Sequence, residues 1–167
     1  MLNFLKRKSL STQVAHELAK MALRIEQEQQ DSIDAVSKAL AISIQKVISE
    51  YRHLRVYMIE SVVHTISSEC DAGDSFRIDF ETSLSSLAVD QGLGNDFWKQ
   101  QQKRTPVYDN AWQDLRGVGV GTAIATAFAS QIKSEDDFLD VLPLSLFCTN
   151  LLAPLVKYCR KLRIVSD

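Results

Sequence analysis

The chain has 167 residues, of which 46% are hydrophobic and 24% are charged, proportions typical of a globular protein with a sizeable core. Its 19 basic and 21 acidic residues leave a formal net charge of -2, so no basic excess favours nucleic acid as a partner. Three cysteines are too few for a disulfide framework. The opening residues, MLNFLKRK, lack the order of charged and apolar residues that a signal peptide needs. We therefore expect one domain, residues 1–167, in the cytoplasm.

The first periodic segment begins at Ser11 or Thr12 and predicts an amphipathic helix. Apolar residues recur in it at spacings of three and four: Val14, Leu18, Met21 and Ile25. The pattern fades in the polar stretch EQEQQDS, where Asp31 or Ser32 is suited to cap a further helix.

Residues 31–69 predict one long helix, because apolar residues repeat at helical spacing without a proline or glycine. The polar stretch ECDAGDS, with Gly73, is the expected stop signal. About ten turns would extend roughly 55 Å, which is long for a domain of this size. We therefore expect a second copy of the chain to cover the apolar stripe, at Tyr51, Leu54, Met58, Val62, Val63 and Ile66. The alternative is a bend at residues 49–53 that makes two helices within one subunit.

The same segment carries a Glu-x-x-His motif, Glu50 to His53, of the kind that binds metal in di-iron helix bundles. This motif belongs to a polar stripe about 80° wide, at roughly 100° per residue. The stripe comprises Glu50, His53, Tyr57, Glu60 and His64. It centres nearly opposite the apolar stripe, and the chain has no second Glu-x-x-His. We therefore predict a solvated polar face, and we expect neither a metal site in one subunit nor a cofactor.

Residues 76–90 fit both an alternating strand and a helix. A single strand would have no partner in this chain, so we favour a helix, followed by a loop at QGLGND. Thr105 and Pro106 then resemble an N-cap and a first helical residue. They predict the start of an apolar central helix over residues 107–132.

Within that helix, the stretch LRGVGVGTAIATAFAS places glycines at 117, 119 and 121. A phosphate-binding loop is disfavoured, because no strand precedes the glycines and no Gly-Lys-Ser/Thr follows them. Gly117, Gly121, Ala125 and Ala129 are four apart, which allows close packing of a buried helix. Three glycines cost a helix about 3 kcal/mol relative to alanine, so a break between two helices is the alternative.

The C-terminal segment, residues 134–164, predicts a short helix capped by Ser134 and then a second helix. Pro143 breaks or kinks the first, and Pro154 can kink the second. Two uncharged runs, 117–132 and 141–156, are shorter than the nearly 20 residues that span a bilayer. We expect them to be core helices and keep a membrane-associating helical hairpin as a minor alternative.

These patterns predict an all-α fold, a single-domain bundle of about five to seven helices. No nucleophile motif such as G-x-S-x-G is present, so an enzyme is not expected. The predicted function is association with another copy or with a protein partner. The alternative is a bundle that binds a small molecule in a pocket walled by Trp98, Tyr108, Trp112 and Phe128.

Overall fold

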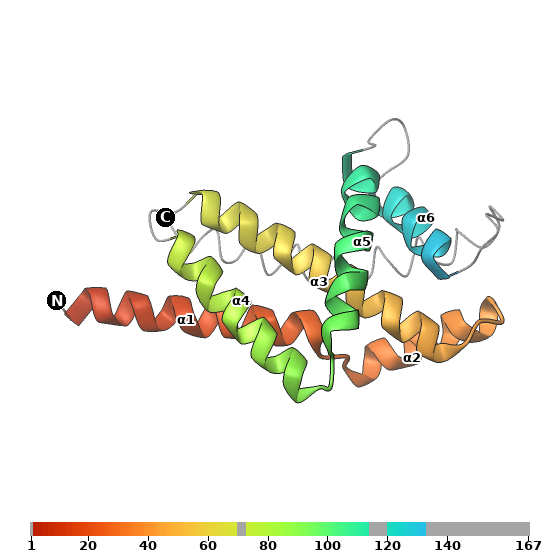
Figure 1. Cartoon of the computed structure of the whole chain (residues 1–167), viewed down its shortest axis with the longest axis horizontal. Helices are drawn as coiled ribbons and strands as arrows, with labels where there is room; N and C mark the ends of the chain where they lie inside the picture. The colour runs from red at the N-terminus through yellow and green to blue at the C-terminus, as the bar shows by residue number, and fades with distance from the viewer. Residues whose placement is uncertain (1, 70–72, 114–119, 133–167) are drawn as a thin grey trace. The chain divides into compact units, whose positions relative to one another are not determined.

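The computed structural model describes residues 2–69, 73–113 and 120–132 (Figure 1). Within these ranges the chain forms six α-helices and no strand, which confirms the predicted all-α fold. The helices are α1 (Leu2–Leu23), α2 (Gln27–Ala39), α3 (Ile44–Glu69), α4 (Gly73–Asp90), α5 (Asn95–Gln113) and α6 (Val120–Ile132). The predicted helices of the C-terminal segment, with Pro143 and Pro154, lie outside the described residues, as do Gly117 and Gly119.

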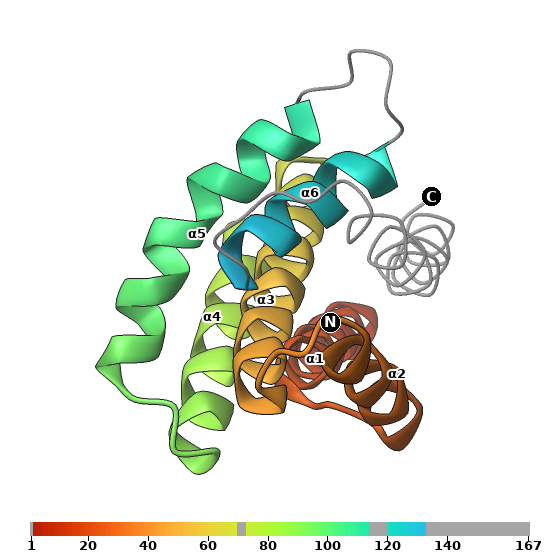
Figure 2. The same cartoon turned by 90° about the vertical axis from the view of Figure 1, so that its right-hand side faces the viewer.

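The chain divides into two compact units. Unit 1 comprises residues 1–24 and 55–98, and unit 2 comprises residues 25–54 and 99–167. Within unit 1, α1 packs along α4; within unit 2, α6 lies near α5 (Figures 1 and 2). The chain crosses between the units three times, once between α1 and α2 and twice inside helices, α3 and α5, and one domain over residues 1–167 stays a prediction.

Small side chains on α1 let it approach α4 closely. The buried residues of α1 are Ala15, Leu18, Ala19, Ala22 and Leu23, and those of α4 include Phe76, Phe80, Leu84 and Ala88. The four-residue spacing on α4 is helical, which confirms a helix over the ambiguous residues 76–90. At one edge, the Thr12 hydroxyl donates to Asp79 Oδ2 at 2.7 Å. Helix α1 begins at Leu2 instead of Ser11 or Thr12, because no glycine or proline interrupts that stretch.

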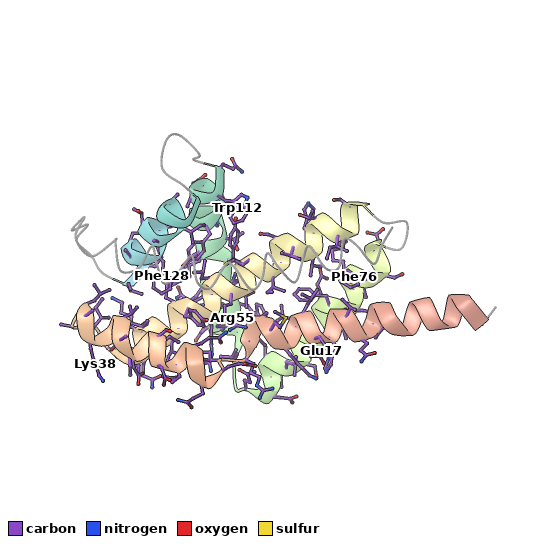
Figure 3. The ribbon with its side chains drawn as sticks, turned by 180° about the vertical axis from the view of Figure 1, so that it is seen from behind. Glu17, Lys38, Arg55, Phe76, Trp112 and Phe128 are labelled. Atoms are coloured by element: carbon purple, nitrogen blue, oxygen red, sulfur yellow. The ribbon has the colours of Figure 1, made fainter. Side chains whose placement is uncertain are left out.

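Arg55 of α3 binds the C-terminal end of α1 through a hydrogen bond. Its side chain is buried, and its guanidinium donates to the Met21 carbonyl in the last turn of α1 (Figure 3). A cation at this end of a helix is stabilised by the partial negative charge of the last carbonyl groups. The contact holds α1 against α3 inside unit 1.

The predicted single helix over residues 31–69 is wrong. The segment belongs to two helices, as in the alternative, but the break is not at residues 49–53. The chain breaks at residues 40–43 between α2 and α3, with Ala41 at a φ of 51°. Ser37 stabilises the break: its hydroxyl donates to the Ile42 carbonyl at 2.6 Å, and its own carbonyl accepts from Ile42 N at 3.0 Å. Serine side chains compete with the helix in this way, even without glycine or proline.

Glycine in place of Ala41 should stabilise the protein. An L-residue with a side chain is strained at positive φ, so Ala41→Gly is expected to raise the free energy of unfolding by about 0.5–1 kcal/mol. Ala35 is exposed inside α2 and provides the matched control. Ala35→Gly should lower the same free energy by about 1 kcal/mol. Urea denaturation followed by circular dichroism measures both, and equal losses in the two variants would contradict the prediction.

Helix α3 is buried on several sides. From residue 50 to residue 59, every position except Arg52 is buried. The predicted solvated face is therefore wrong at Glu50, His53 and Tyr57, whereas His64 is exposed. Among the predicted interface residues, Tyr51, Leu54, Met58 and Val63 are buried, and Val62 and Ile66 are partly exposed. Since the chain itself covers four of these six, they need no second copy.

Helix α3 ends at Glu69, where the polar stretch ECDAGDS is predicted to stop the helix, and Gly73 begins α4. A Cβ atom at this position would overlap the backbone carbonyl of Ser67 in α3. Only glycine lets the two helices of unit 1 approach so closely at this point.

Residues 107–132 belong to two helices, α5 and α6, and residues 114–119 lie outside the described ranges. The predicted start at Thr105 and Pro106 is wrong, because α5 begins ten residues earlier, at Asn95. Thr105 does not cap; its hydroxyl donates to the Gln101 carbonyl at 3.1 Å, one turn back in the helix. Gly121 lies in α6, whose buried residues include Ile124, Ala125, Phe128 and Ile132. None of the described helices is both long and apolar enough to cross a membrane.

Candidate functional site

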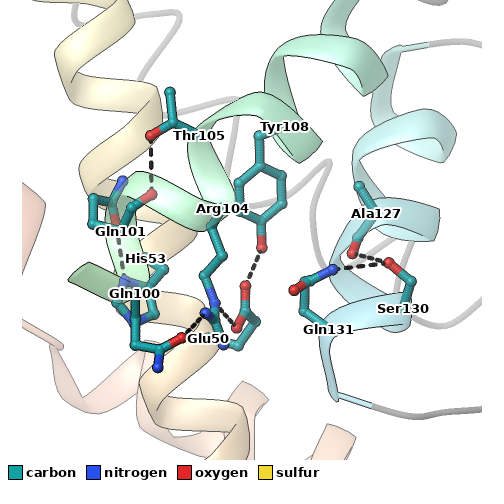
Figure 4. A network of polar contacts seen from close by, with 10 residues as sticks. All are labelled: Glu50, His53, Gln100, Gln101, Arg104, Thr105, Tyr108, Ala127, Ser130 and Gln131. Atoms are coloured by element: carbon teal, nitrogen blue, oxygen red, sulfur yellow. Dashed lines mark hydrogen bonds and ion pairs between the residues drawn. The ribbon is translucent and has the colours of Figure 1, made fainter. Parts of the chain in front are cut away.

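Two helix faces in unit 2 bring polar side chains together in the interior. Glu50 and His53 are three residues apart on α3, and Gln101, Arg104 and Tyr108 follow each other at spacings of three and four on α5. Each set therefore lies on one side of its helix, and the two sets meet (Figure 4). We call these five residues the polar cluster.

The Glu50 carboxylate, only 2% exposed, receives a donor on each oxygen. Arg104 Nε lies 2.5 Å from Oε2, and the Tyr108 hydroxyl donates to Oε1 at 2.7 Å. Arg104 Nη1 also donates to Gln100 Oε1 at 2.8 Å, one turn back on α5. A buried carboxylate with a cation and a hydroxyl on its two oxygens has its charge compensated.

His53 lies in the same cluster with its Nδ1 atom 2.8 Å from Gln101 Oε1. Burial lowers the pKa of His53 below its ordinary value of 6.5. The Gln101 hydrogen bond and the Glu50 carboxylate act in the opposite direction, and the Arg104 guanidinium adds to the lowering. The imidazole is thus neutral at pH 7. Gln101 Nε2, also buried, has no hydrogen-bond partner among the described residues.

The geometry of the polar cluster suits a structural role within unit 2. Both Glu50 oxygens are engaged, so the carboxylate is not poised to act as a base. In the part of the chain that the structure describes, no group of three or more His, Cys, Asp or Glu side chains is arranged to hold a metal. The cluster therefore connects α3 to α5.

Sequence reasoning found Glu50 and His53 but missed their partners on α5. The signal was present: Gln101, Arg104 and Tyr108 form a polar face that complements a carboxylate and an imidazole at the same spacing. The predicted helix start at Thr105 leaves Gln101 and Arg104 outside the helix, whereas α5 begins at Asn95 and includes them.

The four predicted pocket walls have different environments. Tyr108 and Phe128 are fully buried in unit 2, and Trp112 in the same unit is 43% exposed. Trp98 belongs to unit 1 and packs edge-on against Phe97, with ring centroids 5.1 Å apart. The Tyr108 hydroxyl is bound to Glu50. An aromatic pocket stays a prediction.

Three large apolar side chains are exposed among the residues whose burial the structure describes, and two of them, Ile78 and Val89, lie on α4. Ile78 is 58% exposed and Val89 is 74% exposed. They are eleven residues apart, slightly more than three full turns, so they lie on the same side of the helix. Thr82 and Ser85, also exposed, fill the turns between them. We call these four uncharged residues the α4 stripe.

Charged side chains border the α4 stripe. Arg77 and Glu81 form an exposed ion pair, with Arg77 Nε 3.8 Å from Glu81 Oε1. Glu60 of α3, in the same unit, is half-buried. Burial, and second the Glu81 carboxylate, raise the pKa of Glu60 from 4.5 to about 7.

No protein-family model matches the chain, and no match was found among curated proteins or solved structures.

Proposed function

We propose that the chain is a non-catalytic protein that self-associates through the α4 stripe. The observation that carries this proposal is the alignment of Ile78 and Val89, two strongly exposed apolar residues, on one uncharged helix face. Water contact with such residues is unfavourable, and covering them favours association. We place the protein in the cytoplasm on its sparse cysteines alone.

The spacing of the α4 stripe favours a second copy of this chain as the partner. The point midway between Ser83 and Leu84 is equally far along the helix from Ile78 and from Val89. The same point is equally far from Thr82 and from Ser85. When two such helices pack antiparallel about a two-fold axis, Ile78 of one copy meets Val89 of the other, and Thr82 meets Ser85. A surface that complements itself is what a two-fold dimer requires. Small residues at the centre let the two backbones approach.

Val89→Asp should abolish this dimer. The new carboxylate would lie in the apolar contact opposite Ile78, and an unpaired charge is costly to bury there. Light scattering behind a sizing column, over a series of protein concentrations, should show a concentration-dependent dimer for the unchanged chain and a monomer for the variant.

Ala35→Asp is the matched control, since it adds the same charge at an exposed position of α2. It should leave the dimer intact. A monomer at every concentration for the unchanged chain, or a dimer that survives Val89→Asp, would overturn the proposal.

One observation favours the second candidate function, binding of a small molecule in unit 2. Gln101 Nε2 is a buried donor without a partner among the described residues, beside the neutral imidazole of His53. A ligand carbonyl would satisfy it. Native mass spectrometry of the purified protein tests this, because a bound ligand adds mass to the chain and Gln101→Leu should remove it.

A further inference from the structure

We propose that α5 carries a hinge at Pro106 and that the Glu50 carboxylate of α3 keeps this hinge closed. The hinge lies in unit 2 and the α4 stripe in unit 1, so the hinge stands whether or not the proposed dimer forms. It gives the polar cluster a conformational role in addition to connecting two helices.

The backbone of α5 is weakened at Pro106, in the interior of the helix. Proline has no N–H group, so it cannot donate to the Gln102 carbonyl one turn back. The neighbouring Gln101 carbonyl accepts the Thr105 hydroxyl at 3.1 Å, a type of contact that often bends a helix. At two adjacent carbonyl groups the regular helical bonding is therefore altered, and helices kink at such points.

The Glu50 carboxylate bridges the proline with its two oxygens (Figure 4). Its Oε2 atom lies 2.5 Å from Nε of Arg104, two residues before Pro106. Its Oε1 atom accepts the hydroxyl of Tyr108, two residues after Pro106, at 2.7 Å. The carboxylate is 2% exposed and the Tyr108 side chain is fully buried, so water competes little for this hydrogen bond. One side chain of α3 therefore holds α5 on both sides of the hinge.

The polar cluster holds the two sides of the hinge unequally. Before Pro106, two members of the cluster on α5 contact α3, one through His53 and one through Glu50. After Pro106, one member, Tyr108, contacts α3. Loss of the Tyr108 hydrogen bond should therefore release residues 107–113, while the part of α5 before Pro106 stays in place.

Hydrogen exchange of single amides, measured by NMR on the full chain, tests the hinge. In the helical pattern the amides of residues 107–109 donate across Pro106, to the carbonyls of residues 103–105, and the amides of residues 101–104 lie before it. Tyr108→Phe keeps the ring and the ion pair. We expect it to make the amides of residues 107–109 exchange about tenfold faster, the effect of one lost hydrogen bond. The amides of residues 101–104 should change by less than about twofold.

Pro106→Ala tests the proline itself. Alanine at this exposed position restores the N–H group and removes the hinge. When Pro106→Ala is added to Tyr108→Phe, the exchange rates on the two sides of residue 106 should therefore change together. Gln102→Ala is the matched control, because position 102 is exposed one turn earlier and the proline stays. Added to Tyr108→Phe, it should leave the difference of about tenfold in place.

Three results would overturn the hinge. Equal acceleration on both sides of Pro106 in Tyr108→Phe would mean that all of α5 opens together. A difference that persists after Pro106→Ala would mean that the proline is not its cause. Amides of residues 107–109 that exchange without protection in the unchanged chain would mean that Glu50 does not keep the hinge closed.

Discussion

Glu50→Ala is expected to lower the free energy of unfolding by about 3–5 kcal/mol, because it leaves the Arg104 guanidinium largely buried without its carboxylate. The Tyr108 hydroxyl, fully buried, loses its acceptor in the same variant. Urea denaturation at pH 7, followed by far-UV circular dichroism, measures the loss.

The partner side chains provide the controls. Tyr108→Phe removes one hydrogen bond and leaves the ion pair, so it should cost only about 1–2 kcal/mol. Adding Arg104→Met to Glu50→Ala removes the uncompensated cation and should restore part of the lost stability. A loss below 1 kcal/mol in Glu50→Ala would mean that the carboxylate is solvated, contrary to its 2% exposure.

Glu60→Gln is expected to stabilise the protein at pH 8 by about 2 kcal/mol. The pKa of Glu60 is raised in the folded state from 4.5 to about 7, so folding favours its protonated form. Stability is therefore greatest below the unfolded pKa and falls as the pH rises from about 4.5 to about 7. A pKa difference of this size corresponds to roughly 3 kcal/mol, and water at the half-buried carboxylate reduces the expected gain.

The measurement is the free energy of unfolding of both proteins from pH 4.5 to pH 8. The two curves should coincide at the acidic end and separate as Glu60 ionises. Glu81→Gln, as the control, should give a smaller gain, because burial is the larger cause of the raised pKa. Parallel curves across the range would show that Glu60 titrates normally.

The periodicity of apolar residues determined the helical fold. Phe76, Phe80 and Leu84 recur every four residues, and they face the interior because that spacing is close to one helical turn. The loop at QGLGND was also predictable, and Gly92 there has a φ of 70° that suits glycine. Apolar spacing and a glycine at a turn depend only on residues close together in the chain, so the sequence alone is enough to predict these features.

The break at residues 40–43 was not predictable, because it has no glycine or proline. It depends on Ser37 competing for backbone partners and on Ala41 adopting a φ of 51°. The starts of α1 and α5 were misplaced for a related reason. Thr105 and Pro106 resemble a helix start, yet they lie in the interior of α5.

What only the tertiary structure decided is the environment of each helix face. From the sequence, α3 has an apolar side and a polar side, and the polar side is predicted to be exposed to solvent. In the structure both are buried at residues 50–59, since Gln101, Arg104 and Tyr108 supply the partners that Glu50 and His53 need. A polar residue can be buried wherever its hydrogen bonds and charge are satisfied. Those partners lie some 50 residues away along the chain, so the spacing within one helix cannot reveal them.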